Sequence, residues 1–240
     1  MKKLLTALFI MASVPLFAQP WKKITGNGNV KKETRTVANF TSLDSRGSMN
    51  VEITYGNSEG IQVEADENLL PYIETTVENG KLTVKPQKDI SFTTRSKITV
   101  YVSMSKINSL NQSGSGNISG SGPFTGDDKT EVRVSGSGNI KLASVAFNDL
   151  DLYVSGSGKI KIEKGTANNI TAAVSGSGNI DCNNVACNDL NAKISGSGNV
   201  SADAKNSVTA TISGSGNLFY NGDAKHISTK VSGSGKAIKR

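Results

Sequence analysis

Residues 174–180 read VSGSGNI, and close variants of this heptapeptide recur through the second half of the chain. Seven copies of the tetrapeptide Ser-Gly-Ser-Gly recur at intervals of 18 to 22 residues, and an eighth at 119–122 falls outside this spacing. The seven spaced copies begin at Ser113, Ser135, Ser155, Ser175, Ser195, Ser213 and Ser232. A repeat of this period is typical of stacked architectures, in which each unit packs against the next.

Apolar residues flank the copies at fixed offsets. A β-branched residue stands directly before each copy from the second onward: Val134, Val154, Val174, Ile194, Ile212 and Val231. Five positions after the first serine stand Ile118, Ile140, Ile160, Ile180, Val200 and Leu218. Further apolar residues continue outward at two-residue steps, which is typical of strands with one buried face. A flexible Gly/Ser linker would lack this pattern.

Each unit is therefore predicted to be a strand, a Ser-Gly-Ser-Gly corner, a second strand and a polar turn. Glycine suits the corner because it adopts positive φ without steric cost. Two strands per unit could form a meander of hairpins or one coil of a solenoid. Hairpins need no alignment with one another, whereas like side chains at like offsets indicate in-register stacking. We predict an all-β fold, a parallel right-handed β-helix or solenoid with coils of about 20 residues.

The first 18 residues, MKKLLTALFIMASVPLFA, have the layout of a secretory signal peptide, with cleavage between Ala18 and Gln19. The alternative is an N-terminal membrane anchor, but the apolar run of about 14 residues is shorter than the roughly 20 that a spanning helix needs. Cleavage predicts an extracytoplasmic protein, in the periplasm, on the outer surface or secreted. The mature chain is expected to contain no transmembrane span.

Residues 19–110 are predicted to form an irregular β-rich region with degenerate coils, followed by the regular solenoid at 111–240. Two stretches look like degraded corners, ITGNGNV at 24–30 and DSRGSMNV at 44–51. Within this region we expect strands at 49–55, 61–65, 81–85 and 98–102, a helical turn at 67–72, and a hairpin closed by Asn79-Gly80 after a strand at 74–78.

Composition excludes several classes of protein. Aromatic residues make up 5% of the chain, hydrophobic residues 36%, and there are 25 glycines. This excludes a helical bundle, a coiled coil and a polytopic membrane protein. The formal net charge is +7, falling to +5 when Lys2 and Lys3 leave with the signal peptide. The remaining charges form no basic stripe, so no nucleic-acid partner is expected.

An ordered set of motifs extends over the mature chain: ITGNGNV at 24–30, FTSL at 40–43, DENLLPYIET at 66–75, GKLTV at 80–84, ITVYVSM at 98–104 and then the SGSGN corners. In this succession the chain resembles the auto-transporter adhesin head (GIN) domain family. The resemblance implies a secreted or cell-envelope protein with parallel β-helical structure and an adhesin-like role.

Most corners are followed by asparagine, at Asn117, Asn139, Asn179, Asn199 and Asn217, and two by Lys159 and Lys236. Stacked asparagines can hydrogen-bond along a ladder. They could form a polar stripe that contacts a ligand, or a ladder that satisfies its own amides and supports the corner. The second interpretation needs no ligand.

The chain offers few groups for metal or covalent chemistry. Cys182 and Cys187 lie in apolar columns, so both are predicted to point inward, either as a disulfide or as two buried thiols. His226 is the single histidine. One histidine and two buried cysteines do not supply the ligands of a zinc site. We expect no metal and no cofactor.

Acidic residues in the turns are the carboxylates that a glycosidase or lyase would use, and these are Asp127, Asp128, Asp149, Asp151 and Asp189. Such a pair must face each other across the substrate at a defined distance. The leading hypothesis is instead a non-enzymatic exported solenoid that binds a glycan or an envelope protein, or acts structurally. A carbohydrate-active enzyme, a polysaccharide lyase or hydrolase, is the alternative. Self-association through the solenoid ends is a third hypothesis.

Overall fold

The computed structural model describes residues 22–56 and 60–240. The predicted signal peptide, with its cleavage point between Ala18 and Gln19, lies outside the described residues. No helix in the described part of the chain is long and apolar enough to cross a membrane. Nearly all of the regular structure there is β-strand.

The N-terminal part contains β1 (Lys22–Thr25), β2 (Val30–Arg35), β3 (Ser42–Gly47), β4 (Asn50–Thr54), β5 (Ile61–Asp66), the 3-10 helix η1 (Glu67–Tyr72), β6 (Ile73–Glu78), β7 (Lys81–Pro86), β8 (Ile90–Thr93) and β9 (Thr99–Ser103). The remainder contains β10 (Ser109–Gly114), β11 (Asn117–Thr125), β12 (Lys129–Gly136), β13 (Asn139–Ala146), β14 (Asp149–Gly156), β15 (Lys159–Ile162), β16 (Gly165–Thr166), β17 (Asn169–Gly176), β18 (Asn179–Gly196), β19 (Asn199–Gly214), β20 (Asn217–Asn221), β21 (His226–Ser232) and β22 (Lys236–Lys239).

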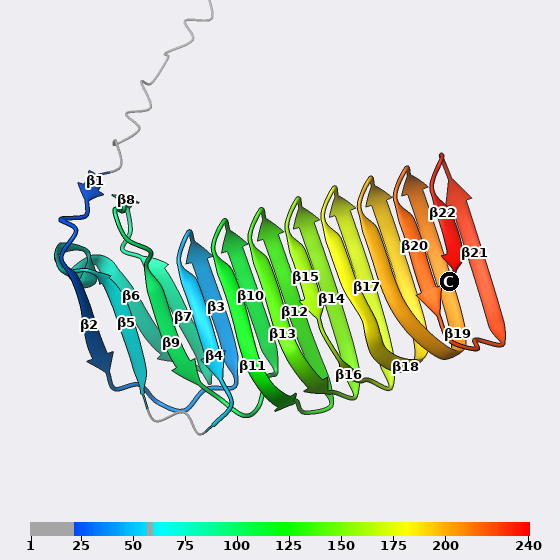
Figure 1. Cartoon of the computed structure of the whole chain (residues 1–240), viewed down its shortest axis with the longest axis horizontal. Helices are drawn as coiled ribbons and strands as arrows, with labels where there is room; N and C mark the ends of the chain where they lie inside the picture. The colour runs from blue at the N-terminus through cyan, green and yellow to red at the C-terminus, as the bar shows by residue number, and fades with distance from the viewer. Residues whose placement is uncertain (1–21, 57–59) are drawn as a thin grey trace, which may run out of the picture.

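The chain winds into a parallel β-solenoid, as predicted. One long side is a sheet of β10, β12, β14, β17, the second half of β18, the second half of β19 and β21, all paired in parallel. The other long side contains β11, β13, β15, the first halves of β18 and β19, β20 and β22. Figure 1 shows the coils stacked side by side, with the Ser-Gly-Ser-Gly corners along one edge.

The corners stack in register. Ser155 pairs with Ser175, and Ser175 pairs with Ser195. The residues at two-residue steps along each strand point between the two sheets, which is why the apolar positions alternate. All of the inward positions singled out by the repeat are buried through the middle coils, including Val134, Ile140, Val154, Ile160, Val174, Ile180, Ile194 and Val200.

Both glycines of each corner lie against a carbonyl oxygen of the preceding coil, and the first also needs an unusual backbone conformation. The first adopts positive φ, for example +115° at Gly176, where an L side chain is strained. The second lies against the preceding coil, and a Cβ at Gly178 would stand 2.5 Å from the carbonyl oxygen of Gly158. This close approach lets one carbonyl, Gly156 O, accept hydrogen bonds from the amides of both Ser177 and Gly178, each at 2.9 Å. The repeated tetrapeptide therefore encodes the contact between coils.

Spatial order and chain order differ in the N-terminal part. β3 pairs in parallel with β10 on one side and with β7 on the other. β4 likewise pairs with β11 and with β9. The coil of β3 and β4 thus lies between two coils that follow it in sequence. Its corner is the DSRGSMNV stretch, whose Gly47 has φ of +93° and pairs with Gly114, so this degraded corner is confirmed.

Antiparallel strands close the N-terminal end of the solenoid. β6 pairs antiparallel with β7, β5 with β9, and β2 with β5. The predicted hairpin is confirmed, since Asn79 and Gly80, with φ of 51° and 70°, connect β6 to β7. The expected helical turn is η1, which contains Pro71.

The prediction that ITGNGNV at 24–30 is a degraded coil corner is wrong. It connects β1, which pairs in parallel with β8, to β2, which runs antiparallel to β5. The strands on its two sides therefore do not continue a parallel coil. Gly28 does have positive φ, +81°, so the local glycine pattern is that of a turn, and the partner strands decide what the turn connects.

Candidate functional site

The asparagine column after the corners forms a hydrogen-bonded ladder. Asn117 Nδ2 donates to Asn50 Oδ1 at 3.0 Å, and Asn139 Nδ2 donates to Asn117 Oδ1 at 2.8 Å. Lys159 takes the next position in the register. Beyond this position the ladder continues from Asn179 to Asn199 to Asn217, with Nδ2 to Oδ1 distances of 3.1 and 3.2 Å. The amides are therefore directed at one another along the solenoid axis.

Acidic residues at the polar turns, at the other end of the strands from the Ser-Gly-Ser-Gly corners, form a second set of hydrogen bonds between coils. Asp149 Oδ1 accepts from Asn169 Nδ2 at 2.8 Å. Asp189 Oδ1 accepts from Asn206 Nδ2 at 2.9 Å and from the hydroxyl of Ser207. The hydrogen bonds from Ser207 and then Asn206 lower the pKa of the Asp189 carboxyl below its usual range. These acids connect successive coils.

Asp127 is held in a similar way by the loop before β10. Its carboxylate accepts hydrogen bonds from Lys106 Nζ and from Asn108 Nδ2, the latter at 2.7 Å. These bonds, that from Lys106 first, lower the pKa of Asp127. A general acid needs a raised pKa near neutrality. Asp127 and Asp189 are shifted in the opposite direction.

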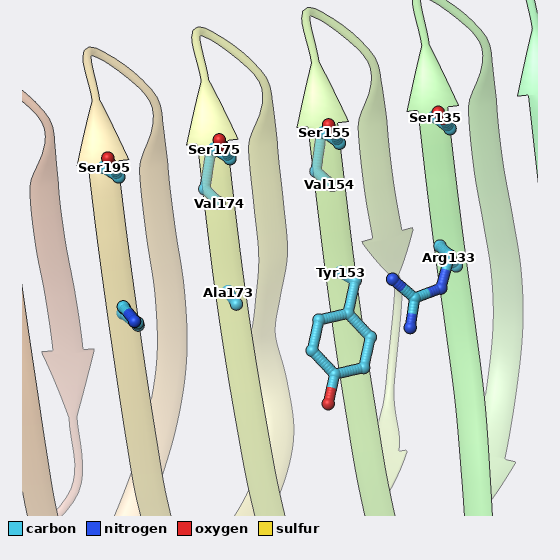
Figure 2. A pocket seen from close by; sticks show the side chains of 10 residues that line it. Arg133, Ser135, Tyr153, Val154, Ser155, Ala173, Val174, Ser175 and Ser195 are labelled. Carbon is cyan, nitrogen blue, oxygen red and sulfur yellow. The ribbon is translucent and has the colours of Figure 1, made fainter.

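A groove of about 590 Å³ lies on the outer face of the sheet formed by β12, β14, β17 and the second half of β18. Along one side it is lined by a row of serines from successive corners, Ser135, Ser155, Ser175 and Ser195 (Figure 2). Along the other side lies the register column Arg133, Tyr153, Ala173 and Lys193. Ala173 has the smallest side chain of that column, so the surface is hollow between Tyr153 and Lys193.

A preformed network fixes the aromatic wall of this groove. The guanidinium carbon of Arg133 lies 4.3 Å from the centroid of the Tyr153 ring, a cation–π contact. Glu131 holds the same guanidinium, with Nε and Nη2 each 3.2 Å from a carboxylate oxygen. The Tyr153 hydroxyl donates to Asp151 Oδ2 at 3.1 Å. Desolvation, and then this hydrogen bond, raises the pKa of Tyr153. Asp151 also pairs with Lys129 Nζ at 2.8 Å.

Lys193 stands at the other end of the groove. Its side chain is exposed on β18, in register with Ala173 of β17. It forms no salt bridge with any residue that the structure describes. The two acids beside the groove, Glu131 and Asp151, are paired with Arg133 and Lys129, so Lys193 leaves this set of charges with a net positive charge.

Sequence reasoning missed this groove because it followed the inward columns. Arg133, Tyr153, Ala173 and Lys193 each stand directly before the β-branched residue that precedes a corner. Comparison of this outward column across units would have shown a small residue between an aromatic one and a lysine. The predicted polar stripe, Asn117 to Asn217, lies at the corner and lines no part of this groove.

Both cysteines are buried free thiols, so of the two alternatives the structure has the thiol pair. Cys182 Sγ donates to the carbonyl oxygen of Ser201 at 3.1 Å. Burial raises the pKa of Cys182 far above that of a free thiol and that of Cys187 to about 12. His226 is exposed on β21 and pairs with Ser207, outside the groove. The described residues include no group of three His, Cys, Asp or Glu side chains placed to hold a metal ion.

Comparison with known proteins decides the family. Residues 39–224 match the family described as "Putative auto-transporter adhesin, head GIN domain". The chain belongs to this family. The matched segment begins just before β3 and reaches beyond β20, so the GIN domain includes every coil corner except the last, at 232–235, together with the asparagine ladder and the groove. No curated protein sequence matches the chain.

Solved structures share the GIN-domain fold over nearly the whole chain. A "putative adhesin" from Bacteroides fragilis has a TM-score of 0.83 at 21% identity, covering 90% of this chain and 100% of its own. A "putative lipid binding protein" from Parabacteroides distasonis has 0.75 at 26%, covering 91% and 100%. A "putative adhesin" from Parabacteroides merdae has 0.73 at 23%, covering 91% and 99%. The solenoid with its N-terminal cap is thus a recurring unit.

Proposed function

We propose that this GIN-domain protein is an exported, adhesin-like module of the cell envelope or cell surface. In this role it binds a partner through one long face of its solenoid and catalyses no reaction. The family described for residues 39–224 and the adhesin names of two similar structures support the adhesin-like part. The signal-peptide pattern at residues 1–18 supports export.

The groove over β12, β14, β17 and β18 carries the proposal. It combines an aromatic side chain held in place by Arg133 and Asp151, a row of serine hydroxyls, and Lys193, which forms no salt bridge within residues 22–56 and 60–240. Side chains fixed before binding lose little conformational entropy when a ligand arrives. A shallow, prearranged surface that combines apolar and polar groups suits recognition of an exposed partner.

The enzyme alternative, a polysaccharide lyase or hydrolase, has less support. It requires a pair of carboxylates facing a substrate, one of them with a raised pKa. At the turns, Asp127, Asp149 and Asp189 bond to neighbouring coils, and hydrogen bonds lower the pKa of Asp127 and Asp189. The acids beside the groove, Glu131 and Asp151, are paired with Arg133 and Lys129. None of them is arranged as a free acid or base.

Two measurements on the native organism and the mature protein test the proposal. Mass spectrometry of the protein from envelope fractions should find an N-terminus at Gln19, and protease added to intact cells should remove it if it lies on the surface. The purified mature chain should bind isolated envelope material and leave a panel of polysaccharides uncleaved. A cytoplasmic protein with an intact N-terminus, or release of reducing or unsaturated sugar ends, would contradict the proposal.

A further inference from the structure

We infer that the groove between Tyr153 and Lys193 is a subsite for a carboxylated sugar of an acidic polysaccharide. The inference rests on the proposed function and names the ligand class for that face. Tyr153 and Ala173 would contact the sugar ring, Lys193 would hold the carboxylate, and the serine row would bond its hydroxyls. Each assignment follows from the position and chemistry of one side of the groove.

The direction of the groove favours an extended polymer. Its lining residues occupy equivalent positions on four neighbouring parallel strands, so the groove crosses the strands and runs along the solenoid axis (Figure 2). Neighbouring parallel strands are spaced by about 4.8 Å. A ligand in the groove therefore meets successive coils one after another, as a chain of sugar rings would.

The floor of the groove disfavours a peptide ligand. Peptides that dock on β proteins commonly add a strand to a free sheet edge. The strands under the groove have parallel partners on both sides, β14 between β12 and β17, and β17 between β14 and β18. Their backbone groups are therefore used within the sheet. The serine hydroxyls remain, and each can both donate and accept a hydrogen bond, which matches the hydroxyls of a saccharide.

The charges of the groove favour an anionic ligand over a neutral one. Arg133 is paired with Glu131 and Lys129 with Asp151, whereas Lys193 is unpaired among the described residues. A carboxylate near Lys193 would neutralise the one uncompensated charge, and a charge-assisted hydrogen bond is about twice as strong as a neutral one.

The aromatic wall specifies a ring with an apolar face. Tyr153 presents an apolar ring with a polar tip, and its position is fixed by Arg133 on the ring and Asp151 on the hydroxyl. The methyl group of Ala173, one coil further, leaves the space beside it. Elsewhere in the same register column stand Asn111, Thr211 and Lys230. No second aromatic residue stands in that column from Asn111 to Lys230, so the geometry assigns a single subsite.

The test is titration calorimetry of the mature protein with oligosaccharides of galacturonate, glucuronate and mannuronate, each beside its carboxyl-reduced counterpart. We expect at least one acidic oligosaccharide to bind about tenfold more tightly than its reduced form, the scale of one charge-assisted bond. Lys193→Glu should weaken that binding about tenfold or more, and Lys193→Arg should retain it. Ala173→Trp, which fills the hollow, should abolish it.

Two controls separate the groove from general effects. Lys230→Glu changes the same charge in the same column, outside the groove, and should leave binding unchanged. The side chains at all three substituted positions point outward, so circular dichroism and thermal melting of the four variants should show the wild-type fold. Binding that is equal for acidic and reduced sugars, or unaffected by Ala173→Trp, would overturn the inference. So would binding to phosphatidylglycerol vesicles that Ala173→Trp abolishes, since this would assign the groove to a lipid headgroup.

The outcomes also distinguish the two proposals. If wild type and Ala173→Trp bind envelope material equally and no acidic sugar binds, the subsite is wrong and the adhesin-like function stands. If neither protein binds envelope material and the native protein is cytoplasmic, the proposed function itself fails.

Discussion

Two regions of the solenoid differ in how their strands pair. One is the set of regular coils from β10 onward, and the other is the N-terminal part. From β12 to β20 each strand pairs in parallel with the strands one repeat earlier and one repeat later in the chain. In the N-terminal part the coil of β3 and β4 lies between β7–β9 and β10–β11, and antiparallel strands cover the end. Register in the first region is carried by a repeated motif, and in the second by contacts distant in sequence.

This difference in strand pairing shows what the repeated corner motif contributes to the fold. In the regular coils one corner motif specifies both the bend and the contact with the previous coil, because its second glycine admits a neighbouring carbonyl. In the N-terminal part the Asn79-Gly80 bend is less tightly packed: a Cβ at Gly80 would have no atom within 4 Å, although the Gly80 carbonyl accepts hydrogen bonds from the amides of Thr41 and Ser42. Substitutions of the same type in the two regions should therefore have different effects.

The largest difference in unfolding free energy should be between alanine substitutions at two glycines with positive φ, Gly176 and Gly80. Gly176→Ala adds strain, and its Cβ would lie 2.6 Å from the carbonyl oxygen of Gly156. We expect a loss of unfolding free energy of about 3 kcal/mol or more, the top of the range for backbone strain. Gly80→Ala has open space around its Cβ and should lose about 1 kcal/mol. Urea unfolding measures both, and equal losses would show that strain alone matters.

A smaller difference in stability is expected between alanine substitutions at two asparagines of the ladder, Asn199 and Asn50. Asn199 both donates to Asn179 and accepts from Asn217, while Asn50 at the N-terminal end of its ladder accepts from Asn117. The backbone amide of Asn217 also donates to Asn199 Oδ1 at 3.1 Å, so Asn199→Ala removes three hydrogen bonds and Asn50→Ala removes one. At about 0.7 kcal/mol for each bond, the expected losses are about 2 and about 0.7 kcal/mol. Thermal melting of the two variants tests this order. The reverse order would contradict a ladder that supports the coils.

Acid should destabilise the two regions through different contacts. The pKa of Asp189 is lowered by hydrogen bonds from Ser207 and Asn206, and that of Glu67 mainly by its contact with Lys31. A lowered folded-state pKa stabilises the protein above the unfolded pKa, and this stabilisation is lost as pH falls through the folded value, here below about pH 4.

Asp189→Asn and Glu67→Gln should each reduce the loss of unfolding free energy between pH 7 and pH 3. Added salt should diminish the Glu67 effect more, because Glu67 and Lys31 form an exposed ion pair. Urea unfolding at pH 7 and pH 3, at low and high salt, measures this loss of unfolding free energy in the wild type and both variants. Equal salt sensitivity at the two sites would contradict this difference in contacts.

The smallest expected signal is the reaction of the two buried thiols in the folded protein. Burial raises the pKa of Cys182 and Cys187, so little thiolate exists at pH 8. We expect the folded protein to react negligibly with a thiol reagent over a period in which denatured protein reacts with two equivalents. Rapid labelling of the folded protein would show that the core of the regular coils opens readily.

Much of the fold could be predicted from the repeat, because glycine bends and period-two apolar positions are local signals. The bend at Gly47 and the hairpin at Asn79-Gly80 were predictable for that reason. The sequence did not indicate that β2 runs antiparallel to β5, nor that β3 pairs with β7. Those contacts depend on which distant strand is available, so the local GNGN pattern at 26–29 was misread as a corner.

The candidate site was less predictable than the fold. The asparagine column was visible, and its hydrogen bonds to neighbouring coils fit the structural interpretation. The groove depends on one alanine, Ala173, between larger neighbours in adjacent coils. A single alanine in the sequence does not predict a groove. The hollow forms because the fold places the larger side chains of Tyr153 and Lys193 on either side of Ala173.

In-register stacking of the corners is tested most directly by disulfide cross-linking between coils. In a Cys182→Ala, Cys187→Ala background, Ser175→Cys and Ser195→Cys introduce thiols at paired positions. Their Cα atoms should be about 4.8 Å apart, within the range for a disulfide. Ser175→Cys with Asn191→Cys, four residues out of register, gives a separation of more than about 12 Å. We expect mild oxidation to cross-link the first pair and not the second; cross-linking of the second pair, or failure of the first, would contradict stacked parallel coils.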